Sequence, residues 1–89
     1  MWNITMSNDA DNSGSQVIAR AATLLRALET QPKGMTISQL SRETGLPRTT
    51  VHRLVTSLES QQLLIMGSGG VQLGPALARL AASAHTDVI

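Results

Sequence analysis

The sequence predicts a mainly α-helical domain in which three helices are followed by a small β-hairpin and the start of a fourth helix. Three observations lead to this fold class. Three segments before residue 62 carry apolar residues at helical spacing. The second and third are joined by the short connection TGLP, whose glycine suits a helix end and whose proline suits a helix start. The runs LLIM and VQL flank a glycine-rich GSGG, as in a hairpin. This order is that of a winged helix-turn-helix.

The composition narrows the classes of protein to which the chain can belong. It has 89 residues, which favours one domain, and no cysteine, which excludes a disulfide framework and a thiolate zinc site. The only aromatic residue is Trp2, so a core must be built from aliphatic side chains and methionine. No apolar run approaches the roughly 20 residues that span a bilayer, and the N-terminus does not resemble a signal peptide. We therefore expect a cytoplasmic protein without a membrane partner.

The charge distribution is more informative than the formal net charge of +1. All seven basic residues lie between Arg20 and Arg79, together with only three acidic residues, which gives this span a net charge of +4. A mildly basic body suits a polyanionic partner.

The N-terminal part is predicted to contain a tail and a first helix. Residues 1–14 are polar and lack helical periodicity, which predicts a mobile tail. The first helix is expected over 15–30, with Ser13 and Gln16 as a capping box. Its apolar face is predicted to consist of Val17, Ile18, Ala21, Leu24, Leu25 and Leu28.

The second and third helices are predicted with defined ends. The second covers about 37–44, because Thr36 and Gln39 form a capping box before it and Gly45 follows it. The third begins near Pro47 and continues to about Gln61. Its buried stripe is predicted to be Val51, Leu54, Val55 and Leu58. At 100° per residue, the opposite polar face carries Thr49, His52, Arg53 and Thr56.

The C-terminal part is predicted to form the hairpin and a fourth helix. A short strand at 34–36 is expected to pair with the hairpin, and Met35 and Met66 are expected to fill the core. The fourth helix is predicted over 76–85. Because the sequence is still helical in character near its end, we expect a fragment of a longer protein.

The polar face of the third helix suggests contact with a DNA major groove. An α-helix fits this groove, and the N-terminal residues of a recognition helix come nearest to the base edges. Arginine can bond guanine in a bidentate manner, and threonine can contact bases or a thymine methyl group. Thr50 points sideways on the helix, where its hydroxyl would meet a phosphate. The predicted base-contacting residues are Arg48, Thr49, His52 and Arg53.

Catalytic and metal-binding motifs are not visible in the sequence. GSGG lacks the strand-loop-helix context and the Lys-Ser/Thr of a phosphate-binding loop. His52 and His85 are far apart, without carboxylates at metal-ligand spacing, and no serine stands in a nucleophile motif. We therefore expect no enzyme, no cofactor and no metal site.

Several segments resemble the IclR family of bacterial transcriptional regulators. The resemblance is carried by SQVIARAATLLRALE, MTISQLSRETGLP, GLPRTTVHRLVTSLESQQLL and VQLGPALARLA, and covers about residues 15–86. It implies a winged helix-turn-helix DNA-binding domain at 15–74 and the start of a linker helix at 75–89. It also implies operator DNA as partner, a homodimer or higher homo-oligomer, and a small-molecule effector bound only by a C-terminal domain absent from this sequence.

The resemblance also implies phosphate contacts at two further places. Arg20, at the start of the first helix, would approach the DNA backbone. Wings of this family often carry basic residues, whereas MGSGGVQL has none. Backbone N–H groups of Ser68, Gly69 and Gly70 would then contact phosphate instead of side chains.

A winged-helix module that binds another protein is the alternative. The Thr- and Arg-rich face of the third helix argues against it, since protein-binding surfaces are enriched in aromatic residues and methionine.

Overall fold

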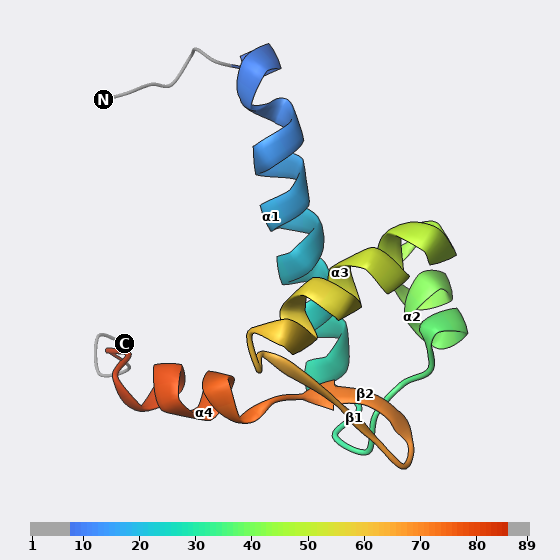
Figure 1. Cartoon of the computed structure of the whole chain (residues 1–89), viewed down its shortest axis with the longest axis vertical. Coiled ribbons are helices and arrows are strands. Elements are labelled where there is room, and N and C mark those ends of the chain that lie inside the picture. The colour runs from blue at the N-terminus through green and yellow to red at the C-terminus, as the bar shows by residue number, and fades with distance from the viewer. Residues whose placement is uncertain (1–7, 86–89) are drawn as a thin grey trace.

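The computed structural model describes residues 8–85, which form four helices and one two-stranded antiparallel sheet. The elements are α1 (Asn8–Glu29), α2 (Ile37–Thr44), α3 (Arg48–Ser60), β1 (Leu64–Gly67), β2 (Gly70–Leu73) and α4 (Pro75–Ala82). Figure 1 shows α2 and α3 beside the C-terminal half of α1, with the hairpin below α3. The N-terminal half of α1 and all of α4 extend away from this body. The fold is the predicted winged helix-turn-helix.

The core joins residues from nearly every element. Its buried members are Leu24, Leu28, Met35, Leu40, Val51, Val55, Leu64 and Val71. Burial of aliphatic side chains removes apolar surface from water, which is the main favourable term in folding. Because α1, α2, α3 and the hairpin all contribute, the relative positions of α3 and the wing are fixed by one shared core.

α1 begins earlier than predicted. The helix is continuous from Asn8, so the predicted start at 15 with a cap at Ser13 is wrong, and residues 8–14 are helical. Once a helix has formed, each added residue gains one hydrogen bond, which allows extension without apolar periodicity. The part of the predicted tail at 1–7 lies outside the described residues.

The predicted apolar face of α1 is buried only in its second half. Leu24 and Leu28 are fully buried, whereas Val17 is 51% exposed and Ile18 is 72% exposed. α2 and β2, the elements with the most extensive contact to α1, lie beside its C-terminal half (Figure 1). The expectation that Val17 and Ile18 pack with the rest of the face is therefore wrong for the described residues.

Replacing Gly14 with alanine is expected to raise the free energy of unfolding by about 0.5–1 kcal/mol, because glycine is unfavourable inside a helix. A β-carbon at this position meets no atom within 4 Å. Thermal unfolding of the two proteins measures the difference. An unchanged melting temperature would indicate that the first stable turn of the helix begins after residue 14.

α2 has the predicted bounds and caps. Thr36 Oγ1 accepts a hydrogen bond from the backbone N–H of Gln39 at 3.1 Å, and Gln39 Oε1 accepts one from the backbone N–H of Thr36 at 2.8 Å. Gly45 ends the helix in the left-handed conformation, with φ of 76°, and its N–H donates to the carbonyl of Ser41. Both reciprocal capping and the left-handed glycine are therefore confirmed.

α3 follows α2 after the connection formed by residues 45–47. Pro47 is the N-cap, with φ of −61° and ψ of 148°, so the helix begins at Arg48 rather than at Pro47 itself. Val51 and Val55 are buried, and Leu54 and Leu58 pack partly buried against the core. The predicted stripe is confirmed, and the helix is fixed through it.

The wing is a hairpin with a two-residue turn. Gly67 pairs with Gly70, so Ser68 and Gly69 form the tip. The strand predicted at 34–36 is reduced to one bridge between Met35 and Val71, with N–H to carbonyl distances of 3.0 and 2.7 Å. Val71 therefore lies between two neighbours and is buried.

The two methionines expected in the core differ. Met35 is buried, whereas Met66 is 57% exposed, so the prediction for Met66 is wrong. Met66 belongs to β1, which pairs only with β2 in the described sheet. Leu64, two residues earlier on the same strand, is buried, so the core covers the start of β1 but does not reach Met66.

Replacing Gly70 with alanine is expected to destabilise the protein by about 1–3 kcal/mol, because strained backbone conformations cost energy of this order. Gly70 has φ of 116°, and an added β-carbon would collide with the carbonyl oxygen of Met35. Urea unfolding measures the loss. A midpoint equal to that of the wild type would contradict the close approach of these two segments.

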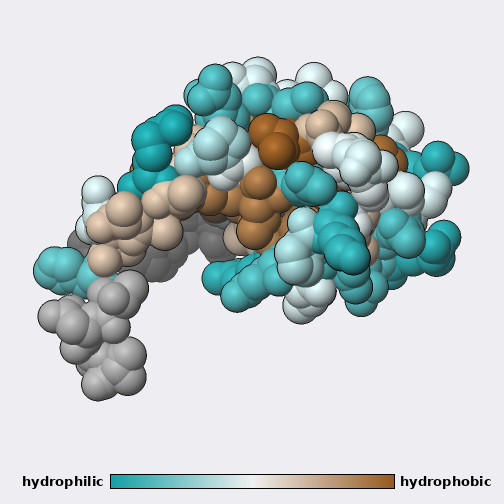
Figure 2. Space-filling model, turned by 90° about the horizontal axis from the view of Figure 1, so that it is seen from below, coloured by the Kyte–Doolittle hydropathy of each residue, from teal (hydrophilic) through white to brown (hydrophobic). Residues whose placement is uncertain are grey.

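α4 ends at Ala82, three residues before its predicted end, and none of its residues is buried. A short helix gains most of its stability from packing, and in α4 only Ala76 and Leu77 are half-buried. Leu80 is 61% exposed, and Ile65 and Leu73 of the hairpin are also partly accessible. Figure 2 shows hydrophobic residues gathered on the face seen from below. No helix in the range 8–85 is long and apolar enough to cross a membrane.

Candidate nucleic-acid interface

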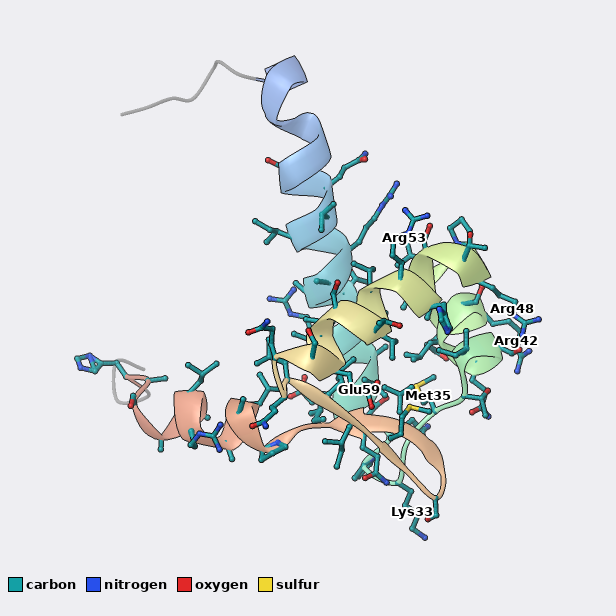
Figure 3. All side chains as sticks on the ribbon, viewed as in Figure 1. Lys33, Met35, Arg42, Arg48, Arg53 and Glu59 are labelled. Carbon is teal, nitrogen blue, oxygen red and sulfur yellow. The ribbon has the colours of Figure 1, made fainter. Side chains whose placement is uncertain are left out.

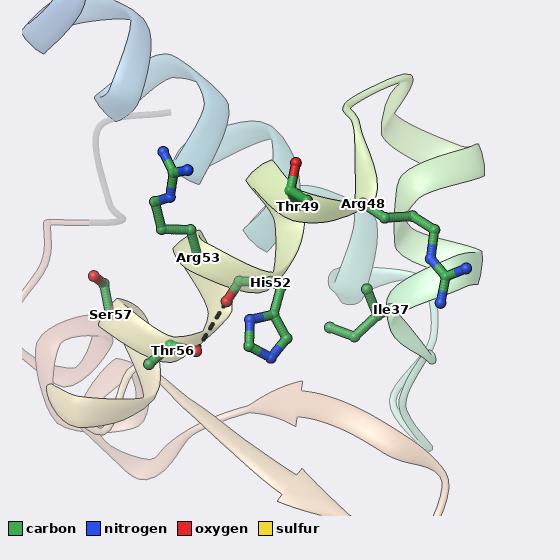
Figure 4. Close-up of a pocket in the computed structure, with 7 residues that line it drawn as sticks. All are labelled: Ile37, Arg48, Thr49, His52, Arg53, Thr56 and Ser57. Carbon is green, nitrogen blue, oxygen red and sulfur yellow. Dashed lines mark hydrogen bonds between the residues drawn. The ribbon is translucent and has the colours of Figure 1, made fainter.

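An open concavity of about 680 Å³ lies over the exposed side of α3 (Figure 4). Its lining residues come from α3, apart from one residue of α2. They are Ile37, Arg48, Thr49, His52, Arg53, Thr56 and Ser57. The structure thus brings together all four residues that were predicted to contact bases.

Helical geometry explains why these side chains share one surface. Arg48, Thr49, His52 and Arg53 are all exposed, whereas Val51 between them is fully buried. At 100° per residue, positions three and four apart project in nearly the same direction. Packing of the buried stripe into the core therefore determines the direction in which the polar side chains point.

The turn between α2 and α3 is held by side-chain hydrogen bonds. Ser41 Oγ donates to the carbonyl of Leu46 at 2.6 Å, and Thr44 Oγ1 donates to the carbonyl of Leu40 at 2.7 Å. Thr44 Oγ1 also accepts from the N–H of Leu46 at 3.2 Å. These bonds fix the orientation in which α3 leaves α2, so its first turn is presented by a structured connection.

The concavity combines two positive charges with hydrogen-bonding side chains. Figure 4 shows Arg48 and Arg53 toward opposite ends, with Thr49 and His52 between them. Guanidinium groups carry a fork of donors that matches the guanine edge or a phosphate. Thr56 Oγ1 donates to the carbonyl of His52 at 2.9 Å, so its proton is already used within the helix. The surface is suited to an anionic ligand with acceptor groups.

The N-terminus of α3 adds backbone donors to the same region. Its first helical hydrogen bond runs from the N–H of Val51 to the carbonyl of Pro47 at 3.0 Å. Helix geometry leaves the N–H groups of the preceding residues without partners inside the helix, and the positive dipole end lies there. Arg48 and Thr49 therefore stand where a phosphate or a base edge is favoured.

The residues predicted to contact phosphate lie outside this concavity. Arg20 is half-buried on α1, and Thr50 is half-buried on the side of α3. Ser68 and Gly69 are exposed at the tip of the wing. Their contacts with DNA stay a prediction.

Three lining residues, Ile37, Thr56 and Ser57, were not predicted to contact DNA, although Thr56 was expected on the polar face. Ser57 is four residues after Arg53, so helical periodicity alone could have placed it there. Ile37 of α2 is half-buried against the core and also lines the concavity. Its position depends on how α2 and α3 cross, which the local sequence does not reveal.

Sequence comparison identifies relatives among transcriptional regulators. The model of the IclR helix-turn-helix domain matches residues 17–64. The HTH-type transcriptional regulator TtgV of Pseudomonas putida is 44% identical over 78 residues, which cover 85% of this chain and 30% of TtgV. An HTH-type transcriptional regulator of Mycobacterium tuberculosis is 36% identical over 83 residues, covering 91% of this chain and 32% of the regulator. The chain thus spans about a third of the length of these relatives.

Solved structures agree with this assignment. An IclR-family regulator from Rhodococcus sp. superposes with a TM-score of 0.69 at 25% identity, over 97% of this chain and 34% of its own. An IclR homolog from Microbacterium hydrocarbonoxydans, solved in complex with 4-hydroxybenzoate, gives a TM-score of 0.68 at 31% identity, over 75% and 28% of the two chains. The family match covers more than half of the chain, and the fold and the exposed face of α3 agree with it: the chain belongs to the IclR helix-turn-helix family.

Proposed function

We propose that this domain binds double-stranded DNA in a sequence-specific manner, as the DNA-binding part of a bacterial transcriptional regulator. One observation carries the proposal: the four exposed side chains predicted to contact bases line one concavity on α3. The family membership of the chain supports it. Such a protein would act in the cytoplasm, where bacterial DNA is located.

Each residue of the concavity has a role that follows from its chemistry. Arg48 and Arg53 would bond the O6 and N7 atoms of guanine, and Thr49 would contact a base or a thymine methyl group. His52 would donate to an acceptor on a base edge from the middle of the face. With α3 in the major groove, these contacts determine which sequence is bound.

Phosphate contacts would position the domain without reading sequence. Arg20 on α1 and Thr50 on the side of α3 are the proposed contacts beside the groove. The tip of the wing, with Ser68 and Gly69, would approach the backbone on the other side. These interactions add affinity that is independent of sequence and sensitive to salt.

We further propose that the protein acts as a homodimer or higher homo-oligomer, with one α3 in each half-site. Residues 15–74 would be the DNA-binding unit, and 75–89 the start of a linker helix. A small-molecule effector would act through a separate C-terminal domain, in keeping with relatives about three times as long as this chain. A related Microbacterium protein was solved with 4-hydroxybenzoate, which makes small aromatic acids reasonable first candidates.

Fluorescence anisotropy with labelled duplex DNA at 50 and 200 mM salt tests the proposal. The affinity is expected to fall steeply with salt, since bound counterions are released from each neutralised phosphate. Failure to bind any duplex at 50 mM salt would instead favour the alternative, a winged-helix module that binds protein.

A further inference from the structure

The wing contains no basic residue, although hairpin tips of this kind lie beside the DNA backbone in the proposed complex. Between residues 62 and 74 the sequence has no lysine or arginine. The structure supplies a cation from another part of the chain. Lys33, in the turn between α1 and α2, lies next to the end of the hairpin (Figure 3).

Four contacts join the backbone around Lys33 to the wing. Gln72 Nε2 of β2 donates a hydrogen bond to the carbonyl of Lys33 at 2.9 Å. Gly69 lies so close to the same carbonyl oxygen that an added β-carbon would collide with it. The two hydrogen bonds between Met35 and Val71 continue this attachment. The turn that carries Lys33 is therefore attached to the wing and not merely near it.

Several hydrogen-bond donors are accessible at this end. The side chain of Lys33 is exposed, and so is Ser68 at the tip. Within the described part of the chain, the N–H groups of Ser68 and Gly69 donate to no backbone group outside the hairpin. An ammonium group, a hydroxyl and backbone N–H groups thus gather around one small turn, a combination that favours an anion.

We propose that Lys33 and the tip of the wing form one composite contact to a DNA phosphate, with Lys33 providing the charge that the wing lacks. This inference rests on the DNA-binding function proposed above. Figure 3 shows Lys33 at the lower end of the molecule, beside the tip of the hairpin, and Arg48 near the start of α3. The lysine ammonium is a compact charge on a flexible side chain, and a contact with phosphate carries no sequence information. Lys33 would therefore contribute to affinity and not to sequence preference.

Gln72 is the positioning residue of this contact. Its side chain lies across Gly67, where a β-carbon would come within 2.6 Å of Gln72 Cδ, and it ends on the carbonyl of Lys33. No phosphate contact is assigned to Gln72 itself. It holds the tip of the hairpin against the turn that carries the cation, so that both reach the same phosphate.

The test measures the salt dependence of DNA binding for Lys33→Gln, Lys33→Arg and the wild type. Losing one neutralised phosphate is expected to reduce the slope of log affinity against log salt by about 0.9. When the salt is raised from 50 to 200 mM, the fold-loss of affinity should therefore be about 3.5 times smaller for Lys33→Gln than for the wild type. Lys33→Arg should keep the wild-type slope, and the ranking of duplex sequences should be the same for all three proteins.

A matched control removes a charge elsewhere. Arg79 is exposed on α4, and Arg79→Gln is expected to leave the slope unchanged. If Lys33→Gln binds with the wild-type slope, the composite contact is refuted while DNA binding itself stands. If the wild type binds no DNA, the proposed function fails instead, so the two failures are distinguishable.

A second variant tests the role of Gln72. Gln72→Met removes the hydrogen bond to Lys33 and keeps a side chain of similar length. In this background, Lys33→Gln should change the salt slope by less than it does in the wild type. If Lys33→Gln changes the salt slope equally with Gln72 and with Met at position 72, the positioning role is refuted. A residue that only stabilises the fold would not alter how many phosphates Lys33 neutralises.

Discussion

Replacing Leu40 with alanine is expected to lower the free energy of unfolding by about 2–5 kcal/mol, the range for deletion of a buried leucine side chain. Leu40 is fully buried on α2 and is a member of the core that also contains Val51 of α3. A domain of this size rarely has more than about 3–5 kcal/mol of stability from its core. We therefore expect much of the variant to be unfolded at 25 °C by circular dichroism.

The same leucine-to-alanine change at an exposed site is the control. Leu80 on α4 is 61% exposed, and Leu80→Ala should change the stability by less than about 0.5 kcal/mol. Similar melting temperatures for the Leu40 and Leu80 variants would contradict the core described above. Loss of folding in the Leu40 variant alone would show that α3 is held in place by packing against α2.

Replacing Arg53 with alanine is expected to weaken binding to the preferred DNA site by about 1–3 kcal/mol, the value of a bidentate contact to a base. Arg53 is exposed and lines the concavity, away from the core, so the fold should persist. Base preference at one position of each half-site should relax at the same time. Titrations with the preferred duplex and with a duplex of scrambled sequence measure both effects.

The comparison of the two duplexes assigns the role of Arg53. A larger loss on the preferred duplex indicates base contact, whereas an equal loss on both would assign Arg53 to a phosphate. Arg79→Ala, on α4, removes the same charge at a distance from the concavity and should bind both duplexes like the wild type. Unchanged binding by the Arg53 variant would remove this residue from the interface.

The helix-turn-helix itself could be predicted because its signals are local. The capping box of Thr36 and Gln39 and the left-handed Gly45 involve residues within a few positions of one another. The stripe from Val51 to Leu58 has the period of a helix, so the exposed face of α3 followed directly. Four of the residues that line the concavity were predicted on this basis.

Other features depend on contacts between distant segments and were not accessible in this way. Val17 and Ile18 continue the apolar pattern of α1, but none of the described elements covers them. Met66 is exposed although Leu64, two residues earlier on β1, is buried, and Ile37 lines the concavity because of the crossing of α2 and α3. The bond from Gln72 to Lys33 joins residues 39 positions apart, so the charge beside the wing emerges only in three dimensions.

Selection of bound sequences from a random duplex library is the most direct test of sequence reading by α3, because it reports sequence preference and symmetry together. With the wild-type protein, we expect one enriched motif with two symmetric half-sites, about one helical turn apart or a multiple of it. The Arg53→Ala protein should enrich the same motif with a relaxed preference at one position of each half-site. A bound pool with no enriched motif would contradict sequence reading by α3, whereas an identical motif for both proteins would contradict a base contact by Arg53.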